Sequence, residues 1–156
     1  MAVTTVTYGA RTEFANDSNL NSLGSTSLCA IGPVDNSGSG VAGADAFIVD
    51  FSISLASSSV SSTGTLTAYL IQSSVSTSSG FTDGISPTGA SVTVVNAKVV
   101  YVANANTNSQ VVADTFRLPV PDPAKYWSLV WLNGSGAALK SSANSVYYLP
   151  ITYTTQ

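Results

Sequence analysis

The sequence contains no histidine and, among its 156 residues, only one cysteine (Cys29) and one glutamate (Glu13). Without histidine, the chain cannot build a Ser-His-Asp or Cys-His catalytic site, and it has no imidazole ligand for a metal ion. A single cysteine can form neither a disulfide within the chain nor a thiolate zinc site. These absences exclude several of the commonest classes of hydrolase and metal-binding domain.

Charged residues are also sparse. They make up 8% of the chain, five basic and eight acidic, and give a net charge of −3. The basic residues are scattered, so we expect no binding to nucleic acid, which needs clustered cations. Their dispersion also argues against an electrostatic membrane anchor, and no apolar run approaches the roughly 20 residues of a membrane helix. The N-terminus lacks a basic start followed by an apolar stretch, so we expect no signal peptide.

Hydroxyl and amide side chains take the place of charged ones. Serine and threonine together supply 43 residues and asparagine supplies 10, while apolar residues make up 44%. That apolar content is enough to bury a core, so the chain is not of the disordered type. A monomer with so little surface charge has weak protection against association. We therefore expect a folded protein that works as a homo-oligomer, a dimer or a trimer.

Alternation of apolar and polar residues with a period of two predicts β-strands along most of the chain. In the segment 47–55 every second residue is large and apolar, and Asp50 and two serines lie between them. This segment and 65–72 are predicted to pair as a hairpin. No window carries an apolar stripe of helical period. The other predicted strands cover 3–8, 26–31, 92–103, 111–118, 125–132 and 146–155.

About eight strands in a chain of this length predict an all-β protein, an antiparallel β-sandwich whose favoured topology is a jelly roll. An immunoglobulin-like sandwich is the alternative; the length of the chain and the lack of paired cysteines around a tryptophan argue against it. Residues 1–25 are predicted to form an extended N-terminal arm or edge segment, because they are polar and rich in Asn, Ser and Gly. Residues 26–156 are then a single β-sandwich domain.

The remaining polar residues form no catalytic motif. Serine has no candidate base, since neither a Ser-x-x-Lys nor a Gly-x-Ser-x-Gly motif occurs. The carboxylates are dispersed and lie in turn-like contexts, where aspartate caps the backbone, so they predict neither a glycosidase pair nor a calcium site. We expect that the protein is not an enzyme, with no catalytic residue, no cofactor and no metal site.

Aromatic residues are the candidates for binding. Trp127 and Trp131 fall on one face of a predicted strand, where they line the sandwich interior or, alternatively, form a stacking platform or a subunit contact. Tyr147 and Tyr148 are adjacent and must face opposite sides of a strand. Together with Tyr153, they are candidate interface residues near the C-terminus.

The C-terminal third, residues 116–156, resembles the end of small capsid decoration (cement) proteins of tailed bacteriophages. The similarity consists of an apolar strand, a proline-rich turn, a Tyr-Trp strand entry and an Asn-x-Ser-Gly turn leading to a leucine. The segment 19–37 and the strand TAYLIQSS with its following loop are also similar to the family. The matching positions in the C-terminal third are Pro119, Pro121, Pro123, Tyr126, Trp127, Asn133, Ser135, Gly136 and Leu139.

This resemblance implies a jelly-roll-like sandwich on the outer capsid surface of a virion. Its implied partner is the major capsid protein, whose subunit junctions it would brace against the pressure of packaged DNA. The protein would be made in the host cytoplasm without a signal peptide. The alternative is a glycan-binding jelly-roll domain of a phage tail or fibre protein, which exposed tryptophan or tyrosine in a shallow cleft would favour.

Overall fold

A computed structural model describes residues 4–36, 43–73, 97–119 and 126–155, and the regular secondary structure among these residues is almost entirely β-strand. No helix among them is long and apolar enough to cross a membrane. The prediction of an all-β protein is confirmed. The elements are β1 (Thr4–Tyr8), β2 (Thr12–Glu13), the 3₁₀ helix η1 (Asp17–Leu20), β3 (Leu28–Asp35), β4 (Ala46–Ser54), β5 (Thr65–Ser73), β6 (Lys98–Asn104), β7 (Val111–Pro119), β8 (Tyr126–Gly134) and β9 (Ser145–Thr155).

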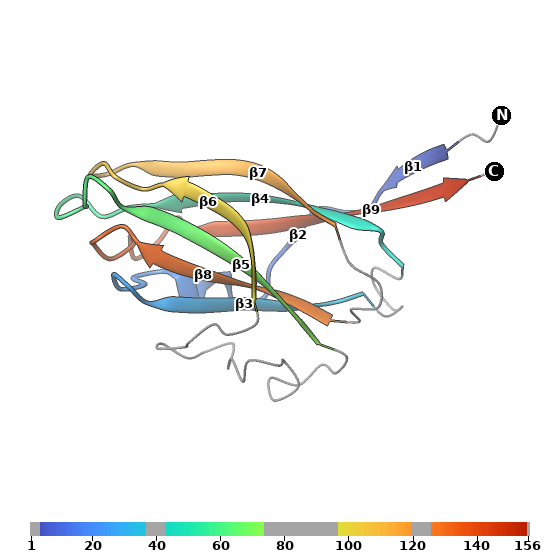
Figure 1. Ribbon diagram of the computed structural model, residues 1–156, viewed down its shortest axis with the longest axis horizontal. Helices are drawn as coiled ribbons and strands as arrows, with labels where there is room; N and C mark the ends of the chain where they lie inside the picture. Colours follow the sequence, from blue (N-terminus) through green and yellow to red (C-terminus); the bar gives the residue numbers. More distant parts are fainter. Residues whose placement is uncertain (1–3, 37–42, 74–96, 120–125, 156) are drawn as a thin grey trace.

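The strands form two sheets that lie one over the other (Figure 1). Sheet A has the order β1-β9-β4-β7, and β2 also pairs with β9; sheet B has the order β3-β8-β5-β6. Every described pairing is antiparallel. The predicted antiparallel sandwich is therefore present, with two packed layers around one core.

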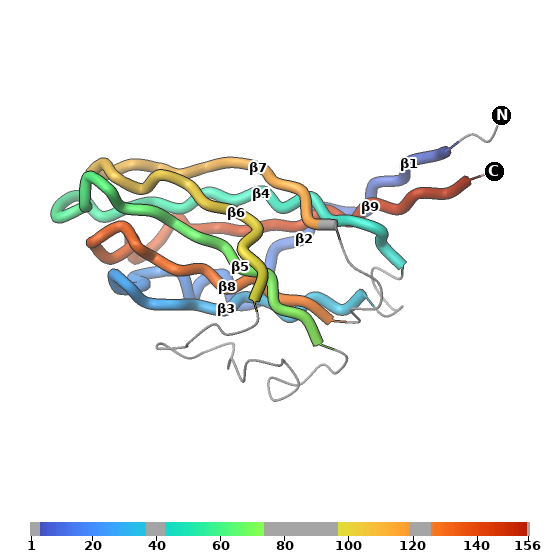
Figure 2. The backbone as a smooth tube through the Cα atoms, in the orientation of Figure 1, coloured from blue at the N-terminus to red at the C-terminus, as the bar shows by residue number. Residues whose placement is uncertain are grey.

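The strand pairs are nested, and this nesting defines the topology. β1 and β2 pair with β9, β3 with β8, β4 with β7, and β5 with β6. The chain thus follows the path of one long hairpin whose two arms run together and alternate between the sheets, as the trace in Figure 2 shows. This is the jelly-roll arrangement. It confirms the favoured topology over the immunoglobulin-like alternative.

The core is made of the inward-facing residues of both sheets. In β4, Phe47, Val49, Phe51 and Ile53 are all buried, in the alternation that the sequence predicts. The tryptophans of β8 lie opposite them, because alternate residues of facing sheets interdigitate. A jelly roll of this length can therefore bury a continuous apolar interior without disulfides.

The predicted hairpin between 47–55 and 65–72 is wrong. Both segments are strands, but β4 lies in sheet A and β5 lies in sheet B. Asp50 of β4 pairs with Thr115 and Tyr147 instead. The period-two pattern specifies a strand and its two faces, whereas the partner of a strand depends on segments that are distant in sequence.

The predicted N-terminal arm divides into two parts. β1 is exposed along its whole length and, with the end of β9, leaves the sandwich as a two-stranded ribbon (Figure 1). By contrast, Phe14, Leu20 and Leu23 are buried in the core. These buried apolar side chains anchor the second part of the segment to the sandwich. The extended part is therefore β1, and the core includes residues that precede residue 26.

Candidate functional site

The outer face of sheet A carries both arginines of the chain, each laid against a tyrosine. Arg11 lies over Tyr147, and Arg117 lies over Tyr153. We call these four residues, together with Asp50, the arginine–tyrosine face. Tyrosine and arginine are the residue types enriched at protein interfaces and at their energetic centres.

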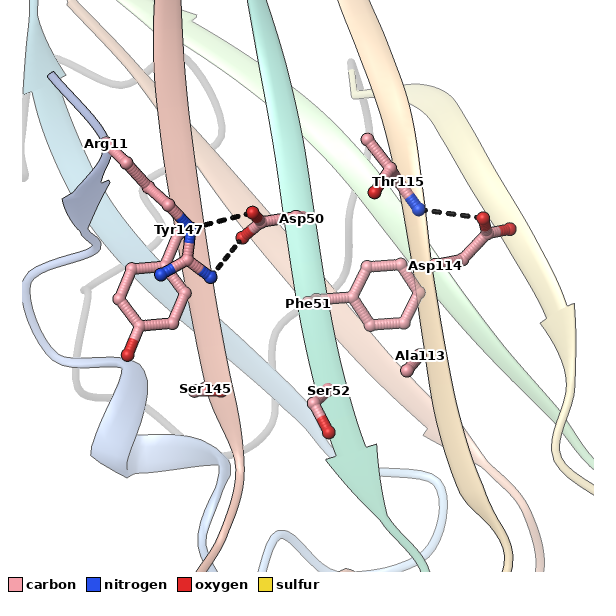
Figure 3. A pocket seen from close by; sticks show the side chains of 9 residues that line it. All are labelled: Arg11, Asp50, Phe51, Ser52, Ala113, Asp114, Thr115, Ser145 and Tyr147. Carbon is pink, nitrogen blue, oxygen red and sulfur yellow. Dashed lines mark hydrogen bonds and ion pairs between the residues drawn. The ribbon is translucent and has the colours of Figure 1, made fainter.

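Arg11 reaches across one strand to bind the next. It directly precedes β2, and its side chain passes over Tyr147 of β9 to Asp50 of β4 (Figure 3). Its Nε and Nη2 donate to the two carboxylate oxygens of Asp50 at 2.8 and 2.9 Å, and its Cζ lies 3.5 Å from the centre of the Tyr147 ring. The hydrogen bonds to Asp50 raise the pKa of Arg11. Because 54% of its side chain is exposed, this pair orients the arginine more than it stabilises the fold.

A shallow depression of about 380 Å³ lies beside this pair. Ala113, Ser52 and Ser145 line it, and they are neighbours across β7, β4 and β9. Arg11 and Tyr147 stand along one side of it (Figure 3). Small residues in a row across three strands leave room for a ligand group, and the surrounding side chains offer hydrogen-bond donors and acceptors.

At the far side of the depression, a tyrosine and a carboxylate tie the edges of the two sheets together. The hydroxyl of Tyr101 on β6 donates to Asp114 on β7 at 2.6 Å, and the Thr115 amide donates to the other carboxylate oxygen at 2.7 Å. Burial, and then the hydrogen bond to Asp114, raise the pKa of Tyr101 to about 12. The same hydrogen bond lowers the pKa of Asp114. A tyrosine with this pKa stays protonated near neutral pH, so the pair acts as a structural tie.

The second arginine–tyrosine pair marks the base of the ribbon. Arg117 on β7 donates to the hydroxyl of Tyr153 on β9, and its Cζ lies 5.5 Å from the ring centre. The Tyr153 amide in turn donates to Asp45 at 2.7 Å. These contacts fix the direction in which β9 leaves the sandwich.

The ribbon itself exposes apolar side chains on one face. Val6, Tyr8 and Tyr153 are 43%, 60% and 37% exposed. Val6 and Tyr153 are directly opposite each other, and Tyr8 is two residues from Val6, so all three point to the same side. This face continues the arginine–tyrosine face through Tyr153. Together they form an exposed surface that is rich in tyrosine, with its charged residues in the arginine–tyrosine face and none in the ribbon.

The structure separates the five aromatic residues that the sequence singles out. Trp127 and Trp131 are each 1% exposed, so both lie in the core and neither offers a stacking platform. Tyr148 faces the interior and packs edge-on against Phe14, with ring centres 5.0 Å apart. Tyr147 faces the opposite side, as adjacent strand residues must, and joins Tyr153 on the outer surface.

Sequence reasoning missed the partners of these tyrosines. Arg11 and Asp50 are 39 residues apart, and neither lies in a motif. Arg117 and Tyr153 are 36 residues apart. Only the order of strands in sheet A brings these side chains together. A strand pattern alone carries no signal for such pairs.

Among the described residues, no group of three or more Cys, Asp or Glu side chains is placed to hold a metal ion. No protein-family model matches the sequence, and no curated protein is significantly similar to it. Two features therefore bear on the function: the geometry of the exposed surface and the resemblance at residues 116–156.

Proposed function

We propose that the protein is a structural component of a virion, a head decoration protein that binds the outside of a phage capsid. It would bind the major capsid protein across the junctions between subunits and act there as a homo-oligomer. The observation that carries this proposal is the uncharged ribbon of β1 and the end of β9, which leaves a well-packed sandwich beside the arginine–tyrosine face. The resemblance at residues 116–156 indicates the class of structural protein, a capsid decoration protein.

The chemistry of this surface suits repeated contacts between proteins. Cementing a shell requires a rigid body and extended strands that can pair with neighbours, and the symmetry of the shell multiplies each contact. Tyrosine supplies large contact area at low entropic cost, and arginine supplies hydrogen bonds to exposed carbonyl groups. Threonine, which dominates the ribbon, favours strands and loses little rotamer freedom there.

The number of copies per virion tests the proposal. Mass spectrometry or a cryo-EM map of virions made by the phage that encodes the chain should find it in hundreds of copies on the head. Adding the purified protein to heads that lack it should restore that coat. A handful of copies, or a location on the tail, would contradict the proposal.

Variants can connect this function to the arginine–tyrosine face. Arg117→Ala and Tyr153→Ala should each weaken binding to undecorated heads, because Arg117 bonds to Tyr153 at the base of the ribbon. Lys98→Ala is the matched control, since it removes a cation from β6, an edge of the other sheet. If Lys98→Ala weakens binding as much as Arg117→Ala, the face does not make the contact.

The depression beside Arg11 favours a second candidate, a glycan-binding domain of a tail or fibre protein. It places a tyrosine, two carboxylates and small hydroxyl residues around an open space of about 380 Å³. A glycan array should then give a signal that Tyr147→Ala abolishes, while the purified chain fails to coat heads. The opposite pattern, coating without a glycan signal, supports the decoration role.

A further inference from the structure

The outer edge of β1 differs from every other described sheet edge because it carries no protection against pairing. Edge strands usually avoid association through charged residues, proline or bulges. β1 has the sequence TTVTY and contains none of these. The other edges each carry at least one: Glu13 in β2, Pro33 and a register shift in β3, Lys98 and a bulge beside β6, and Arg117 in β7.

The main-chain groups of three β1 residues point to this edge. The Tyr153 amide donates to Asp45, which directly precedes β4. Because β4 and β1 lie on opposite sides of β9, this amide points away from β1. Val6 is the partner of Tyr153, so the two form a non-hydrogen-bonded pair and the N–H and C=O of Val6 point outward. The Gly9 amide, which donates to Pro150 at 2.9 Å, fits the same alternation. Thr4 and Tyr8 therefore also present their main-chain groups at the free edge.

We propose that two copies of the chain dimerise through this edge, with β1 pairing antiparallel to β1 of the second copy in a register centred on Val6. This register places Val6 opposite Val6 and Thr4 opposite Tyr8. All three outward-facing residues of each strand then find a partner, and each pair exchanges both main-chain hydrogen bonds. The strand is thus complementary to itself, as a two-fold interface requires.

Pairing also removes a weakness of the monomer. A two-stranded ribbon is marginally stable in water, whereas three or more strands with an apolar face are stable. The dimer has four strands there, in the order β9-β1-β1-β9. Its central row is Tyr153, Val6, Val6 and Tyr153, which joins the exposed apolar faces of the two ribbons. Aromatic and β-branched residues are favourable cross-strand neighbours.

A disulfide between two copies tests the register. In this register the Cα atoms of the two residues at position 6 lie about 5.5 Å apart, which suits a disulfide. After mild oxidation, purified Val6→Cys should run as a dimer that a reductant reverses. Val111→Cys is the matched control, because Val111 is 55% exposed on the edge of β7. The native Cys29 is buried and does not compete.

Sedimentation velocity of the purified chain, from about 5 to about 500 µM, gives the second readout. The unmodified protein should form dimers, Val6→Lys should raise the dissociation constant at least tenfold, and Val111→Lys should leave it unchanged. Three results would overturn the proposal: a monomer at every concentration, a trimer, or equal cross-linking of Val6→Cys and Val111→Cys. No capsid is present in the cross-linking or the sedimentation experiment, so the outcomes of both are independent of the proposed decoration function.

Discussion

The Ser135 hydroxyl donates a hydrogen bond of 2.7 Å to the side-chain oxygen of Asn133, and both residues are completely buried. The Asn133 Nδ2 donates to the carbonyls of Leu23 and Ala137 at 2.9 and 2.8 Å. Gly136 completes the turn with a φ of +87°, a conformation that glycine adopts without strain. The Asn-x-Ser-Gly turn in the family resemblance is therefore a buried polar network that holds the N-terminal segment to the end of β8.

We predict that Asn133→Asp lowers the free energy of unfolding by about 3–5 kcal/mol at neutral pH. The substitution removes the amide donors and places a buried carboxylate against carbonyl oxygens. The deficit should shrink as the pH falls, because a protonated carboxyl group can donate again. Asn108→Asp is the control: Asn108 is exposed, and its side-chain oxygen accepts a hydrogen bond from the Val60 amide. Urea unfolding of the parent and of both variants measures the loss of unfolding free energy in each. Equal losses in the two variants would contradict the prediction.

We predict that Trp127→Ala costs about 3–5 kcal/mol, as truncation of a buried aromatic does. Its ring centre lies 5.4 Å from that of Phe14 and 4.7 Å from that of Phe47. Trp127→Phe should cost only about 1–2 kcal/mol, since it also removes an indole N–H that has no hydrogen-bond partner among the described residues. Chemical denaturation measures both. A loss below about 1 kcal/mol for Trp127→Ala would be inconsistent with its position in the core.

Within the described residues, the sequence was sufficient to predict the longer strands and the two faces of most of them, but not the two-residue strand β2. Residues 92–96 of the predicted strand 92–103 lie outside the described residues. In β4 the alternation of large apolar and small polar residues gives the buried set correctly, because one face of a sandwich strand must be apolar. It was not sufficient for the pairing of β4 with β7 and β9. Those partners lie far along the chain, and the energy that selects them comes from packing of the completed core.

The same limit applies to the candidate site. Tyr147 and Tyr153 could be proposed as interface residues from their type and position, but the arginines that lie on them could not. The buried role of Phe14 was also hidden, since a single aromatic residue in a polar segment has no periodicity to reveal it. Asn133 was visible only as the first residue of the Asn-x-Ser-Gly turn, whereas its side chain donates hydrogen bonds inside the fold.

Cys29 should be unreactive in the folded protein. Its side chain is buried, and burial raises its thiol pKa from 9.0 to about 12, so the reactive thiolate is scarce. A thiol reagent at about pH 8 should modify one group per chain only after denaturation. Because the folded pKa is the higher one, this group's contribution to stability is present below pH 9.0 and is lost as the pH rises toward about 12. Rapid stoichiometric labelling of the native protein would contradict the prediction, and Cys29→Ala should give no labelling in either state.

Asp114→Asn should lower the pKa of Tyr101 without returning it to 10.0. Burial is the larger cause of the raised value, about 12, and it remains in the variant, whereas the charge-assisted hydrogen bond is lost. Tyrosinate absorbance is measured across alkaline pH for the parent and for Tyr101→Phe, and the difference between the two curves gives the titration of Tyr101. The same pair of measurements in the Asp114→Asn background gives its titration without the carboxylate.

The same pair makes stability depend on pH at both extremes. The raised pKa of Tyr101 means that its contribution is present below pH 10.0 and is lost as the pH rises toward about 12. The lowered pKa of Asp114 means that its contribution is lost as the pH falls through the folded value. Asp50→Asn is the control, since Asp50 bonds to Arg11 and not to Tyr101. If Asp114→Asn leaves the titration of Tyr101 unchanged, the tie between β6 and β7 does not form in solution. If the pKa falls all the way to 10.0, burial is not the main cause of its shift.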